Sequence, residues 1–191
     1  MQLKIRPRSI RGFSLLEVMI ALVVLCVGLL GILKLEAAAI SSTTVAAKRS
    51  LAALEASSLA AMMHVNRGYW AKGDVSNAVI TVQGSAALVT SGAPNLVTSL
   101  ASGITCISTT VPCAVSDMAA YDLTQWAIAL NPLLPNYIAT VACGLAAPVS
   151  CTINIVWNEN AVAINAQAAA DQAANPNETF ENPSYRLFVE P

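Results

Sequence analysis

The chain has 191 residues, of which 55% are hydrophobic and only 11% are charged, and its formal net charge is −1. A chain of this length suits one membrane anchor and one modest globular domain. Beyond the first twelve positions there is no cluster of Lys and Arg, so the sequence gives no indication of nucleic-acid binding. With so few charges, the surface must be built largely from Ser, Thr, Asn and Gln.

The longest apolar stretch runs from Phe13 to Leu33 and reads FSLLEVMIALVVLCVGLLGIL. As a helix it would span roughly 30 Å, which is the thickness of the hydrocarbon core of a membrane. It is longer than the apolar region of a secretory signal, and no A-x-A-like cleavage site ends it, so we expect a retained helix. The residues before Gly12 include four bases and no acid: Lys4, Arg6, Arg8 and Arg11. This asymmetry places the N-terminus in the cytoplasm and the rest of the chain across the membrane.

Three kinds of residue interrupt this apolar stretch. A carboxylate within a membrane span costs on the order of 2.5–3.5 kcal/mol, so Glu17 either reaches the interface from the helix end or has a function. Gly28 and Gly31 each cost about 1 kcal/mol relative to Ala in a helix. They indicate either close helix–helix contact or a point where the helix can stretch. Cys26 reads as a small hydrophobic residue.

The stretch RGFSLLEVMIALVVL resembles the class III signal of type IV prepilins and type II secretion pseudopilins. The resemblance rests on a basic leader that ends in Gly12, on Phe13 directly after it, and on Glu17 as the fifth residue of the mature chain. It implies that prepilin peptidase removes residues 1–12 and that Phe13 becomes N-methylated. It also implies that Glu17 neutralises the new amine of a neighbouring subunit, because a buried charge needs a partner.

A helical pattern continues over residues 34–67 and is followed by Gly68, a suitable residue just past a helix end. Apolar or small residues recur at steps of three and four and predict the face that packs on a sheet. These residues are Ile40, Thr44, Ala47, Leu51, Leu54, Ser58, Met62 and Val65. No proline lies between Phe13 and Arg67, whereas major pilins often have one, and this favours a minor subunit.

The remainder, residues 68–191, is predicted to be the globular head. Residues 69–103 contain one expected strand and otherwise read as irregular. A short helix is expected over residues 117–130, where Asn131 and Pro132 would end it. Residues 158–183 are expected to form a surface loop. The expected strands are 78–83, 137–143, 151–157 and 185–190. The whole is therefore predicted to be an α+β, pilin-like fold, in which the long helix packs on a small antiparallel meander.

A second resemblance, to PilV-type minor pilins, rests on the order DLTQW, LLP, ATVAC and CTINIVW. In those proteins a D-L-x-x-W helix precedes a leucine-proline turn and then a Cys-bounded strand pair that ends in V-x-W. The residues at those positions are Asp122, Leu123, Trp126, Leu134, Pro135 and Trp157. The middle of the chain has no counterpart in this pattern.

Four of the five cysteines follow the apolar stretch and would lie in an oxidising compartment, where disulfides form. Four cysteines allow three connectivities. Local pairing, Cys106–Cys113 and Cys143–Cys151, is the simplest, and the second bond would close a hairpin. A crossed pairing is the rival. No C-x₂-C spacing is present, so we expect no zinc site.

The sequence contains no recognisable catalytic set, phosphate loop or cofactor motif, so we expect no enzyme and no cofactor. His64 is the only histidine and reads as a solvent-facing or capping residue. Family resemblance implies a minor pilin near the tip of a type IV pilus; a type II secretion pseudopilin is the alternative, and an adhesin role could be added. The implied partners are prepilin peptidase, other minor pilins, the major pilin, the inner-membrane assembly platform and a tip adhesin. The implied location is the inner membrane, with a periplasmic head, and then the cell-surface pilus.

Overall fold

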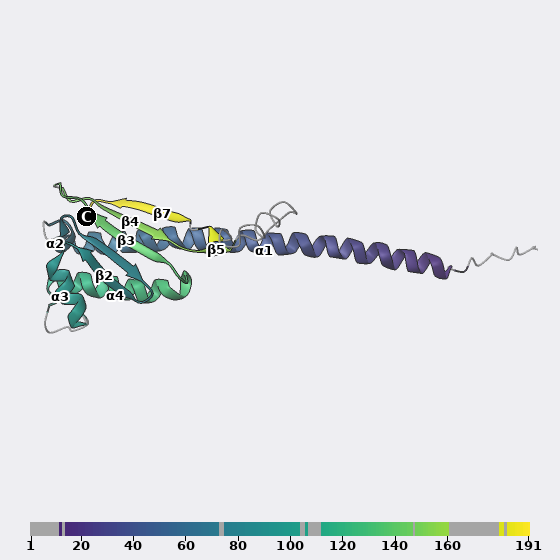
Figure 1. Ribbon diagram of the computed structural model, residues 1–191, viewed down its shortest axis with the longest axis horizontal. Helices are drawn as coiled ribbons and strands as arrows, with labels where there is room; N and C mark the ends of the chain where they lie inside the picture. The colour runs from purple at the N-terminus through teal and green to yellow at the C-terminus, as the bar shows by residue number, and fades with distance from the viewer. Residues whose placement is uncertain are drawn as a thin grey trace, which may run out of the picture. The chain divides into compact units, whose positions relative to one another are not determined.

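The computed structural model describes residues 12, 14–72, 75–103, 106, 112–146, 148–160, 180–181 and 183–191. The chain divides into two compact units, residues 1–42 and 43–191. Helix α1 (Leu15–Val65) has 51 residues and belongs to both units (Figure 1). In the first unit, every described side chain up to residue 37 is exposed. By length and composition this helix could cross a membrane.

The second unit contains a five-stranded sheet in which every neighbouring pair is antiparallel (Figure 1). Its spatial order is β2-β1-β3-β4-β7. The strands are β1 (Val79–Gln83), β2 (Ala86–Ser91), β3 (Ile138–Cys143), β4 (Cys151–Val156) and β7 (Ser184–Val189). A separate pair joins β5 (Glu159–Asn160) to β6 (Phe180–Glu181). The four predicted strands lie in the expected antiparallel order β1-β3-β4-β7, which confirms the predicted sheet. Strand β2 was not predicted and adds an edge on the other side of β1.

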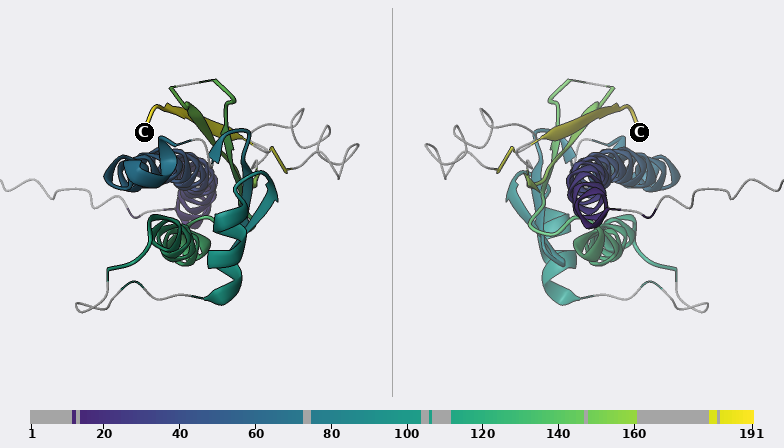
Figure 2. Two further views of the ribbon diagram at one scale, coloured as in Figure 1. Left: turned by 90° about the vertical axis from the view of Figure 1, so that its left-hand side faces the viewer. Right: turned by 90° about the vertical axis from the view of Figure 1, so that its right-hand side faces the viewer.

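Three further helices complete the second unit: α2 (Arg67–Trp70), α3 (Pro94–Ser102) and α4 (Val115–Leu133). Figure 2 shows α4 beside the C-terminal part of α1, with both helices on the same side of the sheet. The indole Nε1 of Trp126 on α4 donates a hydrogen bond of 3.0 Å to the carbonyl oxygen of Glu55 on α1. The ring of Trp126 also meets Tyr137 edge to face, with centroids 6.4 Å apart. These contacts join both helices to one hydrophobic core.

The buried face of α1 differs from the predicted one. Its buried side chains are Ala52, Ala56, Leu59, Ala60 and Met63. In the predicted stripe, by contrast, Leu54 is 64% exposed and Val65 is 89% exposed. Small alanine side chains allow a helix backbone to approach its neighbours closely, so the helix buries its alanine-rich face and leaves part of the larger apolar stripe outside.

Several predicted boundaries also change. Helix α1 ends at Val65, and Gly68 lies inside α2 rather than just past the end of α1. Asn66 interrupts the helix, where its side-chain Nδ2 donates a hydrogen bond of 2.7 Å to the carbonyl oxygen of Val115. Helix α4 continues through Asn131 and includes Pro132, because a proline in the last turn removes only one hydrogen bond. Strand β2 and helix α3 replace most of the segment that was predicted to be irregular.

Glycine is required at position 92, between β2 and α3. Gly92 has a φ of +66°, and a Cβ atom there would lie 2.9 Å from the Cα atom of Ala78. Both the positive φ and the close backbone therefore exclude a larger residue. This tight passage turns the chain from the edge strand into α3.

Two disulfides are present, Cys106–Cys113 and Cys143–Cys151. Cys143 and Cys151 are paired residues of β3 and β4, so their bond closes the hairpin where the two strands meet its connecting loop. Cys26 is a free, exposed cysteine in the first unit. The other four cysteines therefore follow the local pairing and not the crossed one.

Replacing Cys143 and Cys151 together by Ala should lower the free energy of unfolding of the second unit by about 2–3 kcal/mol, because a short covalent loop is opened. The measurement is urea unfolding of the full chain in detergent micelles. Trp70, Trp126 and Trp157 are all buried, so tryptophan fluorescence reports on this unit. Cys26→Ala is the control and should leave the transition unchanged. An unshifted midpoint in the double variant would contradict a stabilising role for this bond.

Candidate functional site

The N-terminal segment places Gly12 immediately before the start of α1, and Phe13 lies outside the described residues. Gly12 is exposed, and a Cβ atom built on it would meet nothing within 4 Å. The described chain therefore gives no steric reason for a glycine at this position. If glycine is required there, the requirement comes from another molecule that acts on the segment.

Glu17 lies in the first turn of α1 and is exposed. The backbone N–H groups of Glu17 and Val18 donate hydrogen bonds of 3.0 and 3.4 Å to the carbonyl oxygen of Ser14, which begins the helix. An acid in the first turn is favoured by the partial positive charge of a helix N-terminus. The described residues offer the Glu17 carboxylate no ion-pair partner.

Gly28 and Gly31 also meet nothing within 4 Å when a Cβ atom is built on them. Neither glycine is therefore required by packing within the described chain. Across the described ranges, no three side chains of His, Cys, Asp or Glu gather where they could hold a metal ion, and His64 is exposed.

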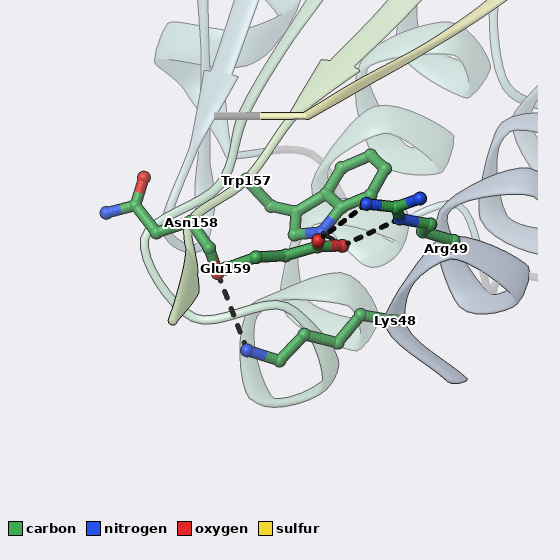
Figure 3. Close-up of polar contacts among 5 residues, drawn as sticks. All are labelled: Lys48, Arg49, Trp157, Asn158 and Glu159. Carbon is green, nitrogen blue, oxygen red and sulfur yellow. Dashed lines mark hydrogen bonds and ion pairs between the residues drawn. The ribbon is translucent and has the colours of Figure 1, made fainter. Parts of the chain in front are cut away.

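A buried acid lies where the sheet meets α1 in the second unit (Figure 3). The carboxylate of Glu159, whose side chain is only 4% exposed, accepts hydrogen bonds of 3.2 and 3.0 Å from Nε and Nη2 of Arg49. It also accepts one of 2.9 Å from the indole Nε1 of Trp157. Beside it, Nζ of Lys48 donates a hydrogen bond of 3.4 Å to the carbonyl oxygen of Asn158. Two adjacent bases on α1 thus hold the chain directly after β4.

The pKa of the Glu159 carboxyl is lowered by these neighbours. Burial alone would raise its pKa, since it disfavours the charged form. Hydrogen bonds from Arg49 and Trp157, together with the positive charges of Arg49 and Lys48, outweigh burial and hold the pKa below its ordinary value of 4.5. The sequence contained no signal for this contact, because Arg49 and Glu159 are 110 positions apart.

A groove of about 540 Å³ opens between α1 and α4, also within the second unit. It is predominantly apolar, and it includes Ser58, Met62 and Val65 from the apolar stripe predicted on α1. Asp122 of α4 also lines the groove, and burial raises the pKa of its carboxyl. The part of the predicted stripe that does not pack on the sheet therefore lines an open groove.

Glu159→Gln should remove a charge-assisted contact and lower the free energy of unfolding by about 1 kcal/mol at pH 7. Because the pKa of Glu159 is lower in the folded chain, its stabilisation is present above pH 4.5 and is lost as the pH falls through the folded value. The wild-type chain should therefore lose more stability between pH 6 and pH 3 than the variant. Glu190→Gln, at an exposed position, is the control. Parallel pH profiles for wild type and Glu159→Gln would refute the assigned role.

Comparison with known families gives one match: a model described as the prokaryotic N-terminal methylation motif covers residues 7–33. The matched segment contains Gly12, Phe13 and Glu17 and extends into α1. No curated protein and no solved structure matches the chain.

The motif and the fold point in the same direction. The fold is α+β and pilin-like, with a long N-terminal helix that begins in an apolar span and a small antiparallel five-stranded sheet. The apolar helix and the motif are compatible with membrane anchoring before assembly. The methylation motif suggests a structural, non-enzymatic role, and it supports the identification of this chain as a type IV pilin-like or pseudopilin protein.

Proposed function

We propose that this chain is a minor pilin of a type IV pilus. It assembles with other minor pilins in a tip or initiation complex, and it promotes pilus assembly and pilus-dependent adhesion or motility. The observation that supports this most directly is the methylation motif over residues 7–33, which leads into a helix whose apolar side chains are exposed. Such a helix requires lipid or other apolar helices around it.

In this proposal prepilin peptidase cuts after Gly12 on the cytoplasmic side of the inner membrane, and Phe13 becomes the N-methylated first residue. The head lies in the periplasm before assembly and on the cell-surface pilus afterwards. Glu17 then pairs with the amine of Phe13 in a neighbouring subunit. The exposure of Glu17, and the absence of an ion-pair partner for it in the described part of the chain, are consistent with a partner supplied by assembly.

The PilV-like subtype is supported by the way α4 uses the D-L-x-x-W pattern. Leu123 and Trp126 are fully buried in the core, whereas Asp122 lies at the groove. The pattern thus serves two purposes, since two of its residues fix the helix and one faces outward. A pseudopilin of a type II secretion system has the same N-terminal motif. Recovery of the chain in fibres sheared from the cell surface supports the pilus, and its retention in the envelope with loss of protein secretion on deletion supports the pseudopilin.

Gly12→Val should block removal of the leader. The motif has glycine at this position, so the peptidase site would have to accommodate a valine side chain where it normally meets only a hydrogen atom. The expected result is that the full-length precursor accumulates in the membrane, as measured by intact-mass spectrometry of the purified chain. The same spectra should show an N-methylated chain that begins at Phe13 in the wild type. Gly28→Val is the matched control, since it adds the same side chain at a helix position where a Cβ atom meets nothing within 4 Å, and it should be processed normally. Normal processing of Gly12→Val would rule out the proposed cleavage.

Glu17→Ala and Glu17→Gln should both be cleaved, yet both should enter filaments poorly. Each variant leaves the amine of Phe13 without its carboxylate in an apolar environment, which costs on the order of 3–5 kcal/mol and corresponds to a decrease of at least roughly 100-fold in incorporation at equilibrium. Incorporation is measured as the ratio of chain in sheared fibres to chain in membranes. Glu36→Ala removes an exposed acid from the same helix and should have no effect. If either Glu17 variant were incorporated like the wild type, the proposed pairing would be wrong.

A further inference from the structure

The groove between α1 and α4 has the features of a docking surface. Met62 and Val65 contribute from α1, and Val115 and Met118 contribute from α4, so its walls are mainly aliphatic and thioether side chains. Val65 is 89% exposed and Val115 is 46% exposed. Apolar side chains grouped in an open groove are unfavourable in water and mark a site where another molecule binds.

One charged group, Asp122, lies among these apolar residues. Its side chain is half-buried, and burial raises the pKa of its carboxyl. No hydrogen bond or ion pair to the Asp122 carboxylate occurs in the described chain. A carboxylate next to apolar surface is stabilised when a cation approaches it. The groove therefore suits an occupant that presents one cationic side chain beside one large apolar side chain.

Strand β7 presents that pair of side chains. Arg186 and Phe188 alternate with Tyr185, Leu187 and Val189, which face the core, so both point to the outer face of the sheet. Phe188 is 73% exposed, and it is the only aromatic residue that is exposed among those whose side-chain burial the structure describes. Arg186 has no ion pair there. In addition, β7 is an edge strand of the sheet.

The spacings of the two surfaces agree. Residues two apart on one face of a strand are separated by roughly 6.5–7 Å, which applies to Arg186 and Phe188. Residues four apart on a helix have Cβ atoms about 5–6 Å apart, which applies to Met118 and Asp122. Arg186 can therefore reach Asp122 while the ring of Phe188 lies against Met118 and Met62. A methionine sulfur next to an aromatic ring adds a favourable contact.

We propose that β7 of one copy of this chain docks in the α1–α4 groove of a second copy, with Arg186 paired to Asp122 and Phe188 between Met62 and Met118. A chain cannot make this contact with itself, because α1 and α4 cover one face of the sheet and Phe188 lies on the other. The contact is therefore heterologous, and repeating it gives an open, filament-like series of subunits. This inference rests on the proposed function as an assembly subunit and assigns to it a contact between heads.

A photo-crosslinker tests the contact directly. Phe188 is replaced by p-benzoylphenylalanine in the purified full chain in detergent micelles, and the crosslinked peptides are identified by mass spectrometry. The expected product is a dimer in which position 188 is joined to Met62 or Met118. Leu88 on β2 is the matched control, because it is 66% exposed at the opposite edge of the sheet and should give little dimer. Crosslinks from position 188 to other surfaces, or equal yields from both positions, would overturn the proposal.

Charge exchange tests the ion pair. Asp122→Arg and Arg186→Asp should each reduce the crosslink at position 188 at least tenfold, because each places like charges together. Combining the two changes in one chain should restore the yield to within about twofold of the starting level, since an opposite pair forms again. Lys72→Asp, at an exposed base outside both surfaces, is the control and should have no effect. Failure of the combined variant to recover, while it unfolds like the wild type, would refute the Arg186–Asp122 pair.

These measurements need neither leader removal nor a pilus. The precursor in micelles should crosslink in the absence of peptidase and assembly proteins. If Gly12 and Glu17 behave as proposed but position 188 does not crosslink, the docking contact is wrong and the proposed function stands. If the crosslink forms but the chain never enters fibres, the contact stands and the pilus assignment fails.

Discussion

The apolar beginning of α1 constrains everything else in this protein. From Ser14 to residue 37 its described side chains are all exposed. A folded head cannot compensate for this, because each buried methylene is worth about 0.8 kcal/mol and this segment buries none of its many apolar groups internally. Apolar surroundings for this segment must therefore come from outside the chain, and the helix is long and apolar enough for a membrane to supply them. The methylation motif at the same end of the chain fits this requirement.

The head holds the C-terminal part of this helix, although only 11% of the residues in the chain are charged. Alanines at positions 52, 56 and 60 let α1 approach its neighbours, and Trp126 adds a hydrogen bond to the helix backbone itself. Arg49 and Glu159 then fix the helix to the end of β4. A consequence of burying the alanine face is that Met62 and Val65 lie at an open groove. The same packing that stabilises the head thus leaves an apolar groove at its surface.

The sequence predicted the parts of this structure that depend on local pattern. The long apolar run, the alternation of β4 and the outer strand β7 were all recognisable because their periodicity extends over five or more residues. The face of α1 was not, because a rule based on large apolar residues overlooks alanine, which is buried for its small size. Strand β2 and helix α3 are short, and their passage through Gly92 depends on a backbone contact with Ala78. No local pattern encodes a contact of that kind.

Long-range polar contacts were equally hidden from sequence reasoning. Arg49 and Glu159 gave no sign of their pairing. Asp122 was noted only because it matches the first position of the D-L-x-x-W pattern. Gly12 and Glu17, by contrast, stood out in the sequence. In the described chain nothing packs against Gly12, and Glu17 has no ion-pair partner beyond the favourable field of the helix N-terminus. Residues required by folding are explained by the contacts within the chain. Residues proposed to act in processing or assembly stand out in the sequence but have no such contacts in the described chain.

Three acids show how this distinction works in a chain with so few charges. Glu159 is deeply buried, and its cation is Arg49 of the same chain, so its charge contributes to folding. Glu17 and Asp122 also lie in apolar surroundings or beside them, yet the described chain supplies no cation to either. An acid that is satisfied internally stabilises the monomer and does nothing for association. An acid left without a cation at an apolar surface makes the monomer slightly less stable, and the same free energy is recovered when another subunit supplies the charge. In the assembly proposed above, charges of the second kind therefore favour association over the isolated subunit.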